Sequence, residues 1–159
     1  MIKMLVAYYS RTGHTKTMAE AIAEGARQTG ALVDAKEVRE FKVETLLDYD
    51  AIVLGSPSYY GSMAAEIKHM LDASITLQGK LTNRVGGAFA TCAHAGGGAE
   101  ITLISLIYAM MVHGMVISSG TLYSPLGPVS LHSGGGTDVD QECRQYGKVV
   151  AQLAAKVRG

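Results

Sequence analysis

The chain has 159 residues, of which 48% are hydrophobic and 18% are charged, a composition typical of a folded domain and not of a disordered chain. Its 14 basic and 14 acidic residues cancel, and a net charge of zero argues against binding of nucleic acid or of an anionic membrane surface. No signal peptide is visible, no apolar stretch is long enough to span a bilayer, and two distant cysteines fit no disulfide or metal framework. We therefore expect one domain over residues 1–159, in the cytoplasm and without a metal site.

The first part of the chain alternates between apolar runs and an amphipathic stretch. Residues Met4–Tyr9 form an unbroken apolar run, which predicts a buried strand. From Lys16 to about Gln28 the apolar residues recur with helical spacing, so we expect a helix there. Leu32–Val38 alternates in the manner of a strand at a sheet edge.

The central part continues the alternation. Phe41–Tyr49 is expected to be a short connector with about one helical turn. Asp50–Gly55 is another solid apolar run and predicts a third strand, which ends at Ser56-Pro57. A helix is expected over Ala64–Ala73, and a fourth strand over Val85–Thr91.

The last part carries a strongly apolar helix, predicted over Glu100–Val112, and a fifth strand that begins at Met115–Ile117. Ser118–Thr137 is rich in glycine and proline and is expected to be irregular, and a final helix is predicted over Val139–Val157. Buried strands that alternate with helices predict an α/β fold with a doubly wound, five-stranded parallel sheet.

The loop that follows the first strand has the composition of an anion site. Hydroxyls of Ser10, Thr12 and Thr15 can donate to phosphate oxygens, and the free N–H groups of the next helix's first turn point the same way. In open α/β sheets, ligands bind beyond the carboxyl ends of the strands. We interpret Ser10–Thr15, the first loop, as a phosphate cradle.

Two further strand ends carry unusual loops: the second loop, Pro57–Met63, and the third loop, Cys92–Gly98. Neither the glycine pattern of dinucleotide binding nor that of triphosphate binding occurs after the first strand, and the acidic residues that a response regulator needs there are absent. Tyr59 and Tyr60 offer rings on which a flat heterocycle could stack, and Gly61 allows close backbone approach. A monophosphate beside a flat ring describes flavin mononucleotide (FMN).

Several segments together resemble one known family. The first loop is similar to the phosphate loop of the flavodoxin-like superfamily, and five further segments resemble its tryptophan-repressor-binding-protein-like NAD(P)H:quinone oxidoreductases. These segments are Tyr49–Ile52, Gly55–Pro57 with Tyr60–Met63, Gly96–Glu100, His113–Ile117 and Arg144–Ala151. The resemblance covers nearly the whole chain and implies a flavodoxin-like sheet with strand order 2-1-3-4-5.

The resemblance also implies a site and an activity. FMN would take two electrons as hydride from NADH or NADPH and pass them to a quinone, in a homo-oligomer (a dimer or a tetramer) in which His113 could approach the flavin of a neighbouring subunit. The residues expected at the cofactor are Ser10, Arg11, Thr12, Gly13, His14 and Thr15 of the first loop, Pro57, Ser58, Tyr59, Tyr60 and Gly61 of the second, Cys92, Ala93, His94, Ala95, Gly96 and Gly97 of the third, and His113.

The chain departs from the family pattern between Glu37 and Tyr49 and between Ser74 and Gly79, where relatives are longer, and it lacks the tryptophan that lines their substrate pocket. An alternative function therefore stays open, a flavodoxin that carries single electrons between protein partners. Such carriers are usually markedly acidic, so the zero net charge favours the reductase.

Plainer interpretations of single features also stay open. The first loop could be an ordinary helix N-cap, and His94 and His132 would more often be solvent-exposed than functional. The apolar helix of residues 101–112 exceeds what one sheet needs, which suggests a subunit interface.

Overall fold

A computed structural model describes residues 1–132 and 138–159. Along the chain, the elements are β1 (Lys3–Tyr8), α1 (His14–Arg27), β2 (Leu32–Glu37), the 3-10 helix η1 (Val43–Asp48), β3 (Ala51–Tyr59), β4 (Ser62–Met63), α2 (Ala65–Ala73), the 3-10 helix η2 (Ser74–Leu77), β5 (Val85–Cys92), α3 (Ala99–Val112), β6 (Val116–Ile117), β7 (Val129–Leu131) and α4 (Val139–Arg158).

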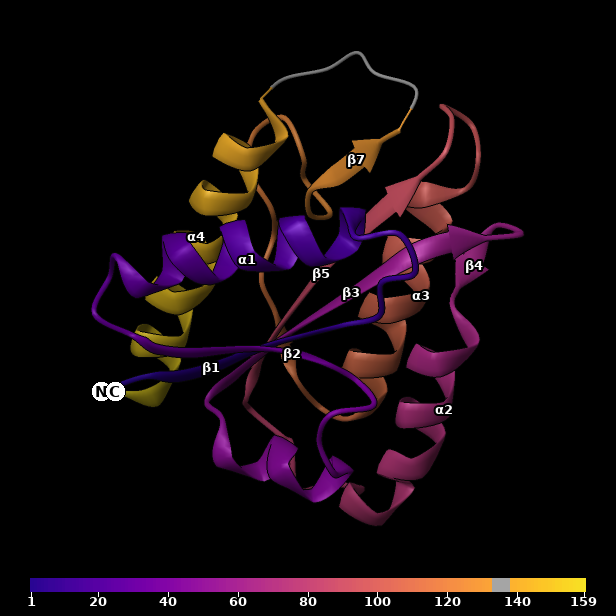
Figure 1. Cartoon of the computed structure of the whole chain (residues 1–159). Coiled ribbons are helices and arrows are strands. Elements are labelled where there is room, and N and C mark those ends of the chain that lie inside the picture. Colours follow the sequence, from indigo (N-terminus) through magenta and orange to yellow (C-terminus); the bar gives the residue numbers. More distant parts are fainter. Residues whose placement is uncertain (133–137) are drawn as a thin grey trace.

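The main sheet runs β2-β1-β3-β5-β6, and all of these neighbours are parallel. This is the predicted order of the five core strands, so the expected α/β class and topology are confirmed. Helices α1 and α4 lie together on one face, and α2 and α3 lie on the other (Figure 1). Parallel strands need helical crossovers of this kind. Because helices cover both faces of the sheet, the inner strands are buried on both sides and are apolar along their whole length.

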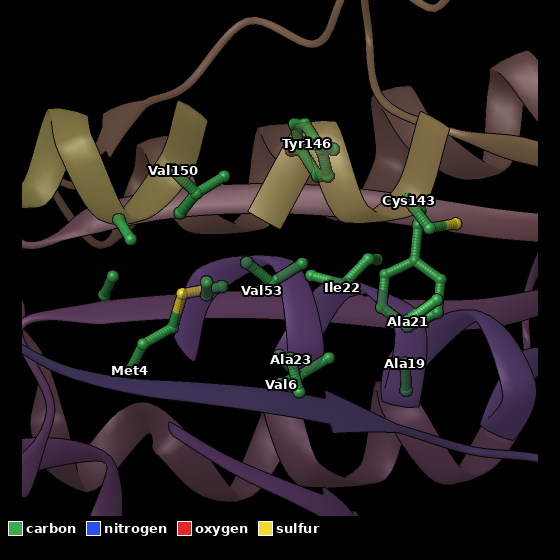
Figure 2. Packing of buried hydrophobic residues seen from close by; sticks show 14 of the residues in the cluster. Met4, Val6, Ala19, Ala21, Ile22, Ala23, Val53, Cys143, Tyr146 and Val150 are labelled. Carbon is green, nitrogen blue, oxygen red and sulfur yellow. The ribbon is translucent and has the colours of Figure 1, made fainter. Parts of the chain in front are cut away.

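Alternation along β1 divides the core into two halves. Met4, Val6 and Tyr8 join the cluster that α1 and α4 cover, whereas Leu5 and Ala7 face the cluster beneath α2 and α3. Figure 2 shows the first half, in which Val53 of β3 also lies close to the side chains of the two covering helices. Successive strand residues point to opposite faces, so one short run builds both halves of the core.

The third strand is longer than predicted. It does not end at Ser56-Pro57 but continues to Tyr59 and turns back to pair antiparallel with β4. Pro57 pairs with Thr91 of β5 on one side. On the other side the pairing of β3 with β1 ends at Tyr8–Gly55, so no neighbouring strand needs the N–H that proline lacks. The prediction that the strand stops at the proline was therefore wrong.

The fifth strand is in two pieces. β6 pairs with the beginning of β5, through Val85 and Gly86, and β7 pairs with its end, from Ala90 to Cys92. The segment between them leaves the sheet and returns, so the expectation of an irregular Ser118–Thr137 missed a strand at Val129–Leu131. Residues 133–137 of that segment lie outside the described part of the chain.

Smaller differences concern the helix ends. Helix α1 begins at His14 and not at Lys16, and α4 ends at Arg158, one residue beyond the predicted end at Val157. Gly30, in a left-handed conformation, follows the end of α1, as a C-terminal stop does. In the described residues, no helix combines the length and the apolar character that a membrane span requires.

Candidate functional site

The three predicted loops meet at the carboxyl edge of β1, β3 and β5. The hydroxyls of Thr15, at the start of α1, and Thr91, near the end of β5, are buried and lie 3.0 Å apart. A Cβ atom added to Gly98 would come within 2.6 Å of the Gly61 Cα, so the second and third loops touch. The topology thus brings together segments that are far apart in the sequence.

The first loop is folded around the side chain of Ser10. Its Oγ accepts hydrogen bonds from the backbone N–H groups of Gly13 (3.1 Å) and Lys16 (3.3 Å). Both bonds use lone pairs, so the hydroxyl proton can be given to a ligand. Gly13 has φ +97° and nothing within 4 Å of where a Cβ would stand, which leaves open space before the first turn of α1. The loop can therefore receive an anion.

The second loop is a tight hairpin between β3 and β4. Tyr59 pairs with Ser62, and the two residues between them, Tyr60 and Gly61, have φ +50° and +75°. Two positive φ angles in a two-residue loop are the pattern of a type I′ turn. The Tyr60 side chain is fully exposed, and Tyr59 is partly exposed. The turn thus presents two aromatic rings at the edge of the sheet, at the cost of an unfavourable backbone conformation for a tyrosine.

A buried hydroxyl in the same strand lacks a partner. The Oγ of Ser58 is buried and makes no hydrogen bond within the described part of the chain. Two residues earlier, Ser56 donates to the Pro57 carbonyl oxygen (2.8 Å) and accepts from the Ala64 N–H (2.8 Å). Buried hydroxyls are normally satisfied, as Ser56 is. Ser58 is therefore a position at which a ligand would supply the missing bond.

The third loop is held in shape by Cys92 and His94. The His94 carbonyl oxygen accepts from the Cys92 thiol (3.3 Å) and from the Gly97 N–H (3.1 Å). Gly96 and Gly98 have positive φ angles, and Gly98 is the N-cap of α3. A cavity of about 630 Å³ opens beside this loop, lined mainly by apolar residues that include Leu103, Tyr123, Leu126, Val129 and Leu131. A space of this size holds a small organic molecule.

Three histidines gather where the first and third loops meet. The rings of His14 and His132 are stacked, with centroids 3.8 Å apart and planes inclined by 24°. The Nδ1 of His14 shares a 2.9 Å hydrogen bond with the Thr12 hydroxyl. Burial, and then the charges of His14 and His94, hold the pKa of His132 below its ordinary value. The sequence interpretation missed His132, because no motif links it to the first loop.

His113 lies apart from the other predicted residues. It caps the carboxyl end of α3, whereas the third loop precedes the amino end of that helix. The Ser74 hydroxyl gives its proton to the Leu71 carbonyl oxygen (2.6 Å), so the His113 Nε2, 2.7 Å away, donates to Ser74. The structure brings the three predicted loops to one edge of the sheet, whereas His113 lies away from them.

Comparisons with known proteins agree with this arrangement. The profile of the Flavodoxin domain family matches residues 5–96. A protein named NAD(P)H dehydrogenase (quinone) from Bradyrhizobium sp. (strain ORS 278) is 35% identical, with 100% of both chains covered. That alignment runs over 199 positions, so the relative contains segments that this chain of 159 residues lacks.

Solved structures of flavodoxin-like proteins also resemble this chain over nearly its full length. The crystal structure of a WrbA-like flavodoxin from Agrobacterium tumefaciens superimposes with a TM-score of 0.81 at 28% identity, over 98% of this chain and 99% of that one. A flavodoxin from the domain Archaea gives 0.77 at 26% identity, over 99% and 100%. The chain belongs to the flavodoxin-like family, and within it is a relative of the proteins named NAD(P)H dehydrogenase (quinone).

Proposed function

We propose that this protein is an FMN-dependent NAD(P)H:quinone oxidoreductase. The observation that carries the proposal is the meeting of the first loop with the tyrosine hairpin and the glycine-rich third loop at one edge of the sheet. The full-length similarity to a protein named for this activity supports the choice of reaction. The exposed tyrosines and the apolar cavity beside the third loop suit flat, apolar partners such as a nicotinamide or a quinone.

The residues present fit FMN. The open space at Gly13 and the free proton of Ser10 suit the terminal phosphate. The unpartnered hydroxyl of Ser58 lies in the strand that leads to the tyrosines, where a ring system with polar edges would satisfy it. A phosphate at one loop and a polar flat ring at the next two match the two ends of this cofactor.

When bound, FMN supplies the redox chemistry, by accepting a hydride from NAD(P)H and giving two electrons to a quinone. The protein's part is to bind the cofactor and to orient it. The first turn of α1 and Ser10 would hold the phosphate, and the backbone N–H groups of the second and third loops would donate hydrogen bonds to the ring. Oriented N–H groups stabilise the negative charge that a ring gains on reduction. Tyr59 and Tyr60 would exclude water from one side of the ring.

A one-electron carrier between protein partners is the second candidate. The similarity to an archaeal flavodoxin and the absence of segments that longer relatives have are the observations in its favour. Carriers use acidic surfaces to steer towards basic partners, and this chain has no net charge. We therefore rank it second.

The test is to load the protein with FMN and follow oxidation of NADH and of NADPH, with and without a benzoquinone. Rapid reduction of the bound flavin by either nicotinamide, followed by quinone turnover, is the expected result. The Thr12→Glu variant, which should not retain FMN, serves as the matched control. If neither nicotinamide reduces the bound flavin, the reductase assignment is wrong and the carrier takes its place.

We also propose that the protein forms a homo-oligomer through α3. Residues Ile101, Ile104, Tyr108 and Met111 are exposed and follow one face of the helix, which carries no charge from Ile101 to Val112. A neutral apolar stripe of this kind suits a second copy of the same chain. Such packing would be needed for His113 to reach a flavin, because within one chain Ser74 holds it at the far end of α3.

The cytoplasm remains the proposed location. Cys92 and Cys143 are both free and buried, which fits a reducing compartment, and NADH and NADPH are available there.

A further inference from the structure

The stacked rings of His14 and His132 carry an inference that rests on the proposed binding of FMN. The two histidines come from separate elements, the start of α1 and the residue after β7. The backbone holds His132 in place, because its N–H donates to the Cys92 carbonyl oxygen (3.0 Å) and so extends the pairing of β7 with β5. The contact is therefore set by the sheet and by the helix start together.

The groups that act on His132 by charge are other imidazoles. His94 of the third loop is the other charged group that acts on His132, and no carboxylate in the described residues contributes to that effect. On the side of α1, Arg11 is exposed and Lys16 lies 3.9 Å from Glu20, a turn further along the helix. The hydroxyl of Thr12 is hydrogen-bonded to the Nδ1 of His14. Lys16 is thus balanced by Glu20, whereas the charges that act on His132 itself are those of imidazoles only.

A metal ion does not account for the group. In the part of the chain that the structure describes, no three side chains of His, Cys, Asp or Glu are arranged to hold one. Stacked rings 3.8 Å apart also turn their faces, and not their nitrogens, towards each other. An anion that sits beside both rings fits better, since protonated imidazoles can donate from their edges.

We propose that His132 and His94 complete, with His14, an imidazole wall that binds the phosphate group of FMN, and that this wall takes up a proton from solvent when the phosphate arrives. The first turn of α1 supplies one side of the phosphate site, and the three rings supply the other. His132 is therefore a further binding residue. It directly follows β7, the second piece of the interrupted fifth strand, which lies at this edge of the sheet.

The direction of the proton transfer follows from charge. Without an anion, burial and the neighbouring imidazoles disfavour a positive charge on His132 and so lower the pKa of its ring. A phosphate dianion favours the charged form, and a proton from the buffer then binds to an imidazole nitrogen. Because the pKa of His132 is lowered in the empty site and raised by the phosphate dianion, FMN binding near pH 7 should be accompanied by a net uptake of protons, up to about one per FMN.

The test is isothermal titration calorimetry of the apoprotein with FMN near pH 7, in two buffers of different ionisation enthalpy, which counts the protons taken up. FMN itself releases only about a tenth of a proton, because its phosphate titrates near pH 6. Riboflavin, which has the ring and no phosphate, should bind without uptake. His132→Gln should lose most of the uptake and weaken FMN binding several-fold, with riboflavin affinity unchanged.

Two variants sharpen the comparison. His132→Lys keeps a positive charge at all pH values tested, so it should retain FMN affinity above pH 8, where the wild type weakens, and show no uptake. His69→Gln, which removes an exposed histidine from α2, is the matched control and should behave as the wild type.

The outcomes separate this inference from the cofactor assignment. FMN binding without proton uptake, or with an uptake that His132→Gln leaves unchanged, overturns the inference alone. A protein that binds neither FMN nor riboflavin overturns both. Uptake that occurs equally with riboflavin would place the effect at the ring and not at the phosphate, and would also overturn it.

Discussion

The hydroxyl of Tyr146, in the middle of α4, accepts a 2.9 Å hydrogen bond from the backbone N–H of Ala88, in the middle of β5. This part of β5 lies between the stretches that pair with β6 and β7, so no strand on that side covers it. Tyr146 is fully buried, and its burial raises the pKa of the phenol well above its ordinary value. The tyrosine replaces a missing strand partner.

Tyr146→Phe should therefore destabilise the protein by about 1–3 kcal/mol, because it leaves the buried Ala88 N–H without an acceptor. Urea denaturation measures the change. Tyr108→Phe, which removes a hydroxyl from an exposed tyrosine of α3, is the control and should have no effect. Equal stability of the Tyr146→Phe variant and the wild type would show that the hydrogen bond contributes nothing.

Gly98→Ala should weaken FMN binding by at least about tenfold. The new Cβ would lie 2.6 Å from the Gly61 Cα and would push the second and third loops apart. Gly79→Ala is a close match, since Gly79 also has a positive φ (+76°) but nothing within 4 Å of its Cβ position. Both variants should lose about 1 kcal/mol of stability from backbone strain, and only the first should lose flavin affinity. Fluorescence titration with FMN distinguishes them.

Thr12→Glu should abolish FMN retention, with an affinity loss of at least about tenfold, because a carboxylate would face the phosphate. Thr76→Glu places the same charge on an exposed threonine of η2 and should leave flavin content unchanged. The flavin absorbance of the purified proteins is the measurement. Full occupancy in Thr12→Glu would remove the first loop from the phosphate site.

Tyr108→Glu should convert an oligomer to a smaller species, because it puts a charge in the middle of the apolar stripe on α3. Light scattering coupled to gel filtration gives the mass. Val157→Glu, on the opposite face of the sheet, should keep the mass of the wild type. A wild-type protein that is monomeric at high concentration would contradict the prediction.

Acid should destabilise the protein partly through His113. Burial lowers the pKa of this histidine in the folded chain, so below about pH 6.5 the unfolded chain binds the proton first. Stability is then lost as the pH falls from the unfolded value towards the folded one. Between pH 7.5 and pH 5.5, the melting temperature of His113→Gln should fall less than that of the wild type. The melting temperature of His69→Gln should fall as much as that of the wild type. An equal loss in all three proteins would contradict this assignment.

The topology was predictable because both faces of the inner strands are covered. Solid apolar runs such as Met4–Ala7 follow from that burial, and they are visible in the sequence. The extension of β3 through Pro57 was not, because it depends on where the neighbouring β1 stops. The short strand β7 was also missed, because a strand of three residues is too short to show a recognisable pattern in the sequence.

The candidate site was likewise only partly predictable from the sequence. The first loop could be read because a local pattern of hydroxyls and a helix start encodes it. The stacking of His132 on His14 could not, because tertiary structure alone brings the two residues together. The placement of His113, in contrast, was predictable, because the helix expected over Glu100–Val112 already separates it from the third loop.

The interrupted fifth strand has a further consequence. The excursion leaves the sheet at Ser118, whose N–H donates to the Gly86 carbonyl oxygen (2.8 Å), and returns at Pro128, whose carbonyl oxygen accepts from Ala90 (3.0 Å). Both ends are thus anchored to the same strand, and everything between them is outside the ladder. Residues could be added to or removed from this segment without shifting the register of any strand. It is a natural point of insertion, where lineages or protein engineers could append a new surface to an unchanged sheet.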